Sequence, residues 1–214
     1  MIVEQFRTGG DRNFGYLAAS EKGGAGVVVD PSYDPEGILA VAEQWGVTIS
    51  YIFCTHGHCD HTERAEVLGQ AVGVPVLIFG DREPNTGRVV ADGATFPLAD
   101  DLGVKVIHTP GHTEDSICLL VGEALFTGDT LFVGKVGGTD LGEQARQEYA
   151  SLHNKLLKLP DATHVWPGHD YGVRPASTIG EERRENPFLL RPDLESFIDL
   201  KRNWTAYKAE HGIS

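Results

Sequence analysis

The stretch Thr55-His56-Gly57-His58-Cys59-Asp60-His61 places three imidazoles and a carboxylate within six residues. Such side chains are poor core residues, because each would need a buried hydrogen-bond partner. Neutral imidazole and carboxylate are, however, the ligands that zinc, iron and manganese accept in proteins. The stretch follows an apolar run, Ile49 to Cys54, that predicts a buried strand. The sequence therefore predicts a metal site on a loop at the end of a strand.

Three later segments repeat this local pattern of an apolar run, a glycine turn and a ligand-type side chain. They are Thr109-Pro110-Gly111-His112-Thr113, Thr127-Gly128-Asp129-Thr130 and Pro167-Gly168-His169-Asp170. Glycine lets a loop approach an ion closely. A low-complexity tract could also cluster histidines, but the flanking residues are ordinary globular sequence. The repetition favours a metal centre built from several loops.

The ligand-type side chains, taken in their order along the chain, resemble the signature of the metallo-β-lactamase-fold superfamily. The positions that match are His56, His58, Asp60, His61, His112, Asp129 and His169. The segments around the last three are most similar to those of glyoxalase II thioesterases and persulfide dioxygenases. The resemblance covers nearly the whole chain and implies an α/β fold, the four-layer αβ/βα sandwich, in which helices flank two mixed β-sheets. We expect a single domain over residues 1–214, because no linker-like tract divides the chain.

Apolar periodicity predicts the elements of this sandwich. Strands are expected over residues 2–6, 16–19, 26–30, 49–54, 74–79, 104–108, 116–121 and 124–127. One helix is expected between an Asp34 N-cap and Gly46, and others over residues 65–72 and 145–156. A final helix is expected from Leu194 to Tyr207, with its apolar side chains packed on the sheet rather than in contact with ligand.

Composition narrows the range of partners and locations. The 214 residues carry a formal charge of −13, which argues against a nucleic-acid partner. The chain lacks an apolar run of about 18 residues, so no membrane span is expected, and the first residues do not resemble a signal peptide. Three cysteines without a zinc-type spacing indicate a reducing, cytoplasmic setting. We expect a small-molecule substrate, and a homodimer from the type of fold alone.

The resemblance also implies a division of the ligands between two divalent ions, zinc in the first instance, with iron or manganese as alternatives. His56, His58 and His112 would hold one ion, Asp60, His61 and His169 the other, and Asp129 would bridge them. Two such ions lower the pKa of a shared water toward about 7. The resulting hydroxide could attack a thioester or ester, as in a hydroxyacylglutathione hydrolase, with Asp60 as a catalytic residue.

The same residues allow a second chemistry. His56, His112 and Asp129 alone would form the facial triad of a non-haem oxygenase that uses one Fe(II). Persulfide dioxygenases have this arrangement and retain the other ligand-type residues, so the motif does not separate the two enzymes. A redox partner like the lactamase-fold part of flavodiiron proteins is disfavoured, because those proteins carry a Glu where this chain has His58.

The substrate-binding residues depart from the family pattern. Glyoxalase II proteins and glutathione-persulfide dioxygenases commonly have a Cys-Gly-Arg run where this chain has Val136-Gly137-Gly138. The missing Arg removes a cation that could pair with a carboxylate such as that of glutathione. Lys135, Tyr171 and Arg88 are the candidate replacements. The sequence thus predicts a thioester or other thiol-derived substrate without naming the thiol.

Overall fold

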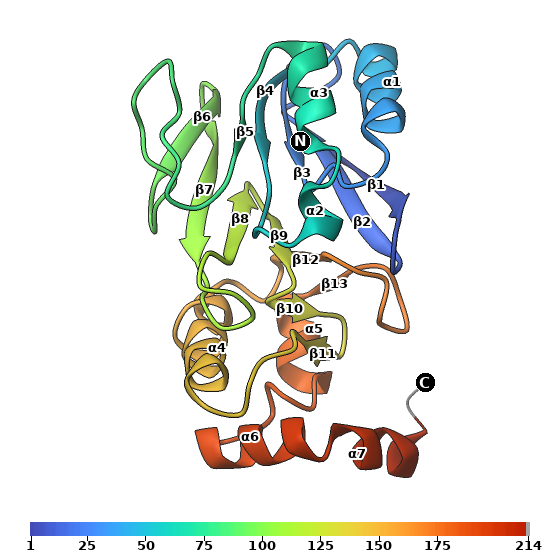
Figure 1. The fold of residues 1–214 in the computed structure, drawn as a ribbon, viewed down its shortest axis with the longest axis vertical. Coiled ribbons are helices and arrows are strands. Elements are labelled where there is room, and N and C mark those ends of the chain that lie inside the picture. Colours follow the sequence, from blue (N-terminus) through green and yellow to red (C-terminus); the bar gives the residue numbers. More distant parts are fainter. Residues whose placement is uncertain (213–214) are drawn as a thin grey trace.

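Two β-sheets form the centre of the computed structural model, which describes residues 1–212 (Figure 1). The first sheet has five strands in the order β1-β2-β3-β4-β5. Their bounds are Ile2–Gly9 (β1), Asn13–Ala19 (β2), Ala25–Val29 (β3), Thr48–Phe53 (β4) and Val76–Leu77 (β5). The first three strands pair antiparallel, whereas β3, β4 and β5 pair parallel. The sheet is therefore mixed, as predicted.

The second sheet has six strands in the order β13-β12-β9-β8-β7-β6. Their bounds are Thr95–Ala99 (β6), Leu102–His108 (β7), Ile117–Val121 (β8), Ala124–Gly128 (β9), His164–Pro167 (β12) and Ser177–Thr178 (β13). Only the β12 and β9 pair is parallel. A short antiparallel hairpin, β10 (Leu131–Phe132) and β11 (Lys135–Val136), follows β9.

Helices cover the outer faces of both sheets. α1 (Pro35–Trp45) and α3 (Ala65–Val72) lie on the first sheet, and the one-turn α2 (Cys59–Thr62) precedes α3. α4 (Glu143–Asn154), the 3₁₀ turn Leu156–Lys158, α5 (Ile179–Glu185) and α6 (Leu194–Arg202) cover the second sheet, and α7 (Trp204–His211) follows α6 at the far end of the molecule from α1 and α3 (Figure 1). No helix among residues 1–212 is long and apolar enough to cross a bilayer.

Strand β2 shows how the four layers form. Tyr16 and Ala18 face the core between the two sheets, while Leu17 and Ala19 face the core under α1. This alternation follows from the period of two in a strand, and β2 is buried on both faces. Phe126 of the opposite sheet packs on Tyr16 with ring centroids 5.0 Å apart. The predicted αβ/βα sandwich with two mixed sheets is confirmed.

The caps of α1 are those predicted from the sequence. Asp34 accepts a hydrogen bond from the Gly37 amide at 3.0 Å, and Gly46 ends the helix in the left-handed region with φ 67°. An N-cap of this kind contributes about 0.5–2 kcal/mol. The local sequence therefore determines both ends of this helix.

Two predicted elements are wrong in extent. The strand expected over residues 74–79 is only Val76–Leu77, because the Asp81 carboxylate accepts the Ile78 amide at 3.0 Å and ends the pairing. The final helix is broken into α6 and α7 at Asn203. The Asn203 amide donates to the Asp199 carbonyl at 3.0 Å, and such side-chain bonds compete with the helix backbone.

Candidate metal centre

The seven predicted ligands meet where strands of both sheets end. His56, His58, Asp60 and His61 follow β4, His112 follows β7, Asp129 follows β9, and His169 follows β12. These side chains form three groups of three, and within each group the ligand atoms of the three side chains lie within 4.8 Å of one another. The groups are His56–His58–His112, His56–His61–Asp129 and Asp60–His61–His169. The fold thus joins residues more than 100 positions apart.

In two of these groups the imidazole nitrogens lie close to one another. His58 Nδ1 lies 3.0 Å from His56 Nε2 and 3.1 Å from His112 Nε2. In the other group, His61 Nε2 lies 3.2 Å from His169 Nε2. Two nitrogens bound to one tetrahedral zinc at about 2.1 Å would lie about 3.4 Å apart. The observed separations are close to that spacing.

Asp129 lies between the two groups. Its Oδ1 is 3.4 Å from the Nε2 atoms of both His61 and His169, and its Oδ2 is 3.6 Å from His112 Nε2. The Oδ1 atom is buried and has no hydrogen-bond partner among the described residues. A buried carboxylate oxygen without a partner is costly. This position suits an oxygen that is shared by two cations.

The outer nitrogens of the imidazoles define which ring atoms face the site. His61 Nδ1 donates to the Asp30 carboxylate at 3.0 Å, and His169 Nδ1 donates to the Asp11 carbonyl at 2.9 Å. His112 Nδ1 donates to the Gly138 carbonyl at 2.7 Å. Neither a carbonyl nor a carboxylate can donate in return, so in the neutral form of each ring Nε2 presents a lone pair inward.

These tautomers make the site a poor hydrogen-bonding network and a good cation site. With Nδ1 protonated in both rings, neutral His61 and His169 would face each other with two lone pairs at 3.2 Å. Only a proton or a metal ion between the two nitrogens makes that contact favourable. The donor set therefore fits divalent metal ions of the kind that accept imidazole and carboxylate.

Burial and charge divide the histidines into two classes. Burial, with a contribution from His61, lowers the pKa of His56 to about 3, and burial also lowers the pKa of His112. Burial opposes the charged forms of His61 and His169 too, but Asp30 and Asp129 beside His61, and Asp129 beside His169, raise their pKa values. The fold thus favours the neutral forms of His56 and His112 and the protonated forms of His61 and His169.

The two carboxylates of the site stay ionised. Burial alone would raise the pKa of Asp129, but contacts with His169 and His61 hold it well below its usual range. For Asp60, a hydrogen bond from Asn13 Nδ2 at 3.0 Å and the two nearby imidazoles outweigh burial and lower the pKa. Both groups can therefore serve as anionic ligands.

Asp30 is a site residue that the motifs did not reveal. It is buried, and its Oδ1 accepts the Thr55 amide at 2.7 Å while Oδ2 accepts the Thr55 hydroxyl at 2.8 Å. The same Oδ2 accepts His61 Nδ1. Asp30 has φ 48°, a left-handed conformation that Asp tolerates better than most residues. The available signal was its place directly after a strand, which it shares with the predicted ligands.

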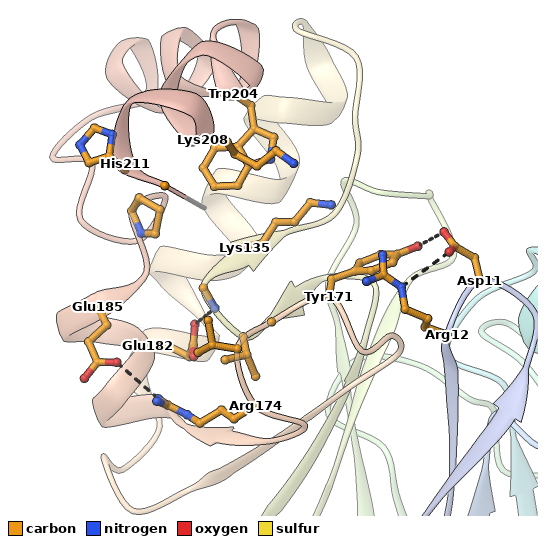
Figure 2. A pocket seen from close by; sticks show the side chains of 16 residues that line it. Asp11, Arg12, Lys135, Tyr171, Arg174, Glu182, Glu185, Trp204, Lys208 and His211 are labelled. Carbon is orange, nitrogen blue, oxygen red and sulfur yellow. Dashed lines mark hydrogen bonds and ion pairs between the residues drawn. The ribbon is translucent and has the colours of Figure 1, made fainter. Parts of the chain in front are cut away.

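A pocket of about 830 Å³ (Figure 2) is lined in part by Tyr171 and Asp11, which both contact the predicted ligand His169. The Tyr171 ring stacks on His169 with centroids 4.7 Å apart, and its hydroxyl donates to Asp11. The Arg12 guanidinium and Lys135 Nζ lie 4.8 Å and 4.5 Å from the Tyr171 ring centroid. Tyr171 therefore links the predicted ligand His169 to a pocket that carries both cations and carboxylates.

The predicted substrate contacts are only partly brought together. Lys135 and Tyr171 line this pocket. Arg88 does not line it; instead, its guanidinium donates to the Thr95 carbonyl and lies 5.8 Å from the Phe96 ring. Its position in the loop between β5 and β6 could not be read from local sequence.

Helix α7 supplies pocket residues that the sequence did not suggest. Trp204 and Lys208 line the same pocket as Lys135 (Figure 2). Trp204 packs on Phe188 with centroids 4.8 Å apart, as expected of an apolar helix face, but it also contacts the pocket. The predicted packing of the final helix is confirmed for Trp204 and Tyr207, and whether Trp204 also contacts a ligand stays a prediction.

Comparisons with known proteins agree with this geometry. The family model of the metallo-beta-lactamase superfamily matches residues 8–169. A hydroxyacylglutathione hydrolase of a Polaromonas species is 37% identical over an alignment 178 positions long, which covers 80% of this chain and 67% of that protein. ETHE1 from Myxococcus xanthus has a TM-score of 0.83 at 33% identity, over 95% of this chain and 91% of that one. A protein solved in a di-iron-bound form has a TM-score of 0.71 at 31% identity, over 87% of this chain and 100% of that one.

Proposed function

The chain belongs to the metallo-beta-lactamase superfamily, and from that premise we propose that it is a metal-dependent hydrolase that cleaves a thioester. One observation carries the proposal: Asp129 lies between His56–His58–His112 and Asp60–His61–His169, two groups of ligand-type side chains. When bound, two divalent ions would supply a hydroxide at neutral pH and polarise the carbonyl under attack. The relatives named hydroxyacylglutathione hydrolase support this reaction class.

The proposed division of the ligands follows the measured contacts. His56, His58 and His112 would hold one ion, and Asp60, His61 and His169 the other, with Asp129 shared. The inward-facing Nε2 lone pairs support this division. Zinc is the first metal to test, with iron and manganese as alternatives, and the di-iron-bound relative supports a pair of ions in this fold.

Asp60 has a second proposed role as the catalytic carboxylate. Its side chain is 30% exposed, whereas those of His61 and His169 are 0% and 3% exposed, so it is the member of its group that meets solvent. Asn13 holds Oδ2 at 3.0 Å, and the lowered pKa keeps the carboxylate ionised. Asp60 can therefore accept a hydrogen bond from the attacking water and orient it toward the carbonyl.

The adjoining pocket supports a thioester of an anionic thiol. Its arginines Arg12 and Arg174 lie beside the carboxylates Asp11 and Glu185. Lys135 and Lys208 form no ion pair among the described residues, so they can offset the missing Arg of the Cys-Gly-Arg run. Tyr171, stacked on His169, would place the thiol carrier next to the ions. Glutathione, with two carboxylates, is the first carrier to test, because the unpaired ammonium groups of Lys135 and Lys208 suit such groups.

The test joins metal stoichiometry with turnover. Protein purified without chelators is expected to contain about two equivalents of metal and to hydrolyse S-lactoylglutathione or another acyl-glutathione. His58→Ala should abolish hydrolysis and lower the stoichiometry. Full thioester turnover after the loss of His58 would refute the binuclear mechanism.

A mononuclear iron oxygenase that acts on persulfides is the second candidate. His56, His112 and Asp129 form the 2-His-1-carboxylate set that this chemistry uses, and Asp129 Oδ2 lies 3.6 Å from His112 Nε2. About one equivalent of iron, together with oxygen consumption in the presence of glutathione persulfide and no thioester turnover, would favour it over the hydrolase.

A further inference from the structure

Helix α4 lies directly behind the loop that carries His112. Ser151 Oγ donates to the Pro110 carbonyl at 2.8 Å. Gly111 packs so tightly on the helix that a Cβ there would lie 2.4 Å from Glu148 Cβ and 2.5 Å from Glu148 Cα. The residue before His112 is thus held against the α4 backbone at Glu148.

Glu148 forms a buried ion pair with Lys201 of α6. The Glu148 side chain is 1% exposed and that of Lys201 is 7% exposed, with Nζ 2.5 Å from Oε2. Lys201 Nζ also donates to the Gly137 carbonyl at 2.6 Å. A buried ion pair is weak support for stability, because desolvation offsets the attraction between the charges. Its fixed geometry is a better explanation for its presence.

The backbone that Lys201 holds is part of the support of the metal site. A Cβ on Gly137 would lie 2.1 Å from the Asp129 carbonyl oxygen and 3.1 Å from both His112 Cβ and Glu148 Oε1. The next carbonyl, that of Gly138, accepts His112 Nδ1 at 2.7 Å. A short run of contacts therefore joins the ion pair to the ring of His112.

We propose that Glu148 and Lys201 are a positioning pair for His112. The pair holds the Gly137–Gly138 segment so that the Gly138 carbonyl fixes the tautomer and the direction of the imidazole. This inference rests on the proposed function only in that His112 holds a metal ion. Neither Glu148 nor Lys201 is among the residues that line the site or the adjoining pocket.

The pair should act on one metal group and not on the other. His61 is oriented by Asp30 and His169 by the Asp11 carbonyl, and both supports lie outside the Gly137–Gly138 segment. Loss of the pair should therefore weaken the ion held by the His112 group and leave the ion held by the His61 group in place. This selectivity separates positioning from a general loss of structure.

Cobalt(II) titration of the metal-free protein tests the proposal without any turnover measurement. Visible absorbance reports the occupancy and affinity of each ion. The wild-type protein should bind two cobalt ions. Glu148→Gln keeps the shape of the side chain and removes its charge. This variant and Lys201→Met should each lower the affinity for one cobalt ion by about 10–100-fold and leave the affinity for the other unchanged. A loss of this size is typical when a residue that orients a metal ligand is removed.

The double variant Glu148→Gln/Lys201→Met separates stability from positioning. It leaves no unpaired buried charge, so its melting temperature should recover relative to either single variant. Its affinity for the weaker ion should stay reduced, because the Gly137 carbonyl still lacks its donor. This variant also provides the affinity measurement if either single variant fails to fold.

Lys155→Met, at the C-cap of α4, is the matched control. Lys155 pairs with Asp92 at 2.9 Å and donates to the His108 carbonyl at 2.7 Å. Because it does not touch the Gly137–Gly138 segment, both cobalt affinities should equal those of the wild type.

The outcomes distinguish this inference from the proposed function. Two cobalt ions bound with wild-type affinities by the Glu148 and Lys201 variants would overturn the positioning role and leave the metal centre intact. A wild-type protein that binds no cobalt would overturn both. A protein that binds two ions but hydrolyses no thioester would refute the hydrolase alone, because the positioning readout is binding.

Discussion

Asp30 connects the strand end of β3 to the ligand loop after β4. It accepts both the amide and the hydroxyl of Thr55 and also the Nδ1–H of His61. Thr55 in turn lies 3.1 Å from His56 Nδ1. One carboxylate thus orients a proposed ligand from each of the two groups, directly for His61 and through Thr55 for His56.

Asp30→Asn should lower metal affinity by about 10–100-fold. An amide offers only one acceptor oxygen, so it cannot accept from Thr55 and His61 as the carboxylate does. Competition with a zinc indicator would measure the change. Asp34→Asn, which alters only the N-cap of α1, is the control, and equal affinities in the two variants would contradict the assigned role.

Stability of the metal-free protein should depend on pH with a maximum near 6.5, the ordinary histidine pKa. The fold lowers the pKa values of His56 and His112. Below pH 6.5 these two rings therefore bind protons in the unfolded chain but not in the folded protein, and the free energy of unfolding falls. Above pH 6.5, His61 and His169, whose pKa values are raised in the fold, lose protons that favour the folded state.

Urea unfolding between pH 5 and 9 would test this expectation. Zinc should remove the alkaline decline, since the ion replaces the protons on His61 and His169. A metal-free stability that keeps rising above pH 7 would show that these two rings are not held as cations.

At the scale of elements, the pocket depends on two short segments, β11 and α7. Lys135 comes from the hairpin strand β11, which α5 supports because Asn186 Nδ2 donates to the Lys135 carbonyl at 3.2 Å. Lys208 comes from α7. Both cations face the same pocket (Figure 2).

Lys135→Ala and Lys208→Ala should each raise KM for an anionic thioester about 10-fold or more and leave kcat nearly unchanged. A hydrogen bond to a charged group contributes about 1.5–3 kcal/mol, and these contacts are made equally in the ground and transition states. Arg88→Ala is the control with wild-type kinetics. A fall in kcat alone would place the lysines in the chemistry instead.

The ends of helices and strands were predicted correctly where a capping residue marks them. They were predicted wrongly where a polar side chain bonds the backbone and ends the element early. The ends of α1 follow from Asp34 and Gly46. The shortened β5 and the break before α7 depend on Asp81 and Asn203, whose side chains bond the backbone and interrupt otherwise continuous apolar patterns.

At the scale of the whole molecule, the proposed metal ligands come from both sheets. His56 and His61 follow β4 of the first sheet, and Asp129 and His169 follow strands of the second. Bound ions would therefore link halves of the chain that otherwise meet through apolar packing such as that of Tyr16 on Phe126.

Removal of metal should lower the melting temperature by about 10 °C. Free metal at about 1,000 times its Kd stabilises a fold by about 4 kcal/mol, and a domain of this size shifts by about 2–4 °C per kcal/mol. Calorimetry with zinc, with a chelator and with magnesium in place of zinc would measure the effect. Equal melting temperatures with zinc and with chelator would argue against a site that links the sheets.

The sequence by itself determined the fold family and which side chains gather at the site, because seven ligand-type residues in order after strand-like runs match one superfamily. The single domain over residues 1–214, the homodimer and the cytoplasmic location stay predictions. Only the tertiary structure decided which nitrogen of each imidazole faces inward, because that depends on Asp30, Asp11 and the Gly138 carbonyl. It also decided that Lys135 and Lys208 share a pocket while Arg88 lies elsewhere, since these contacts join residues distant in the chain, about which local pattern carries no information.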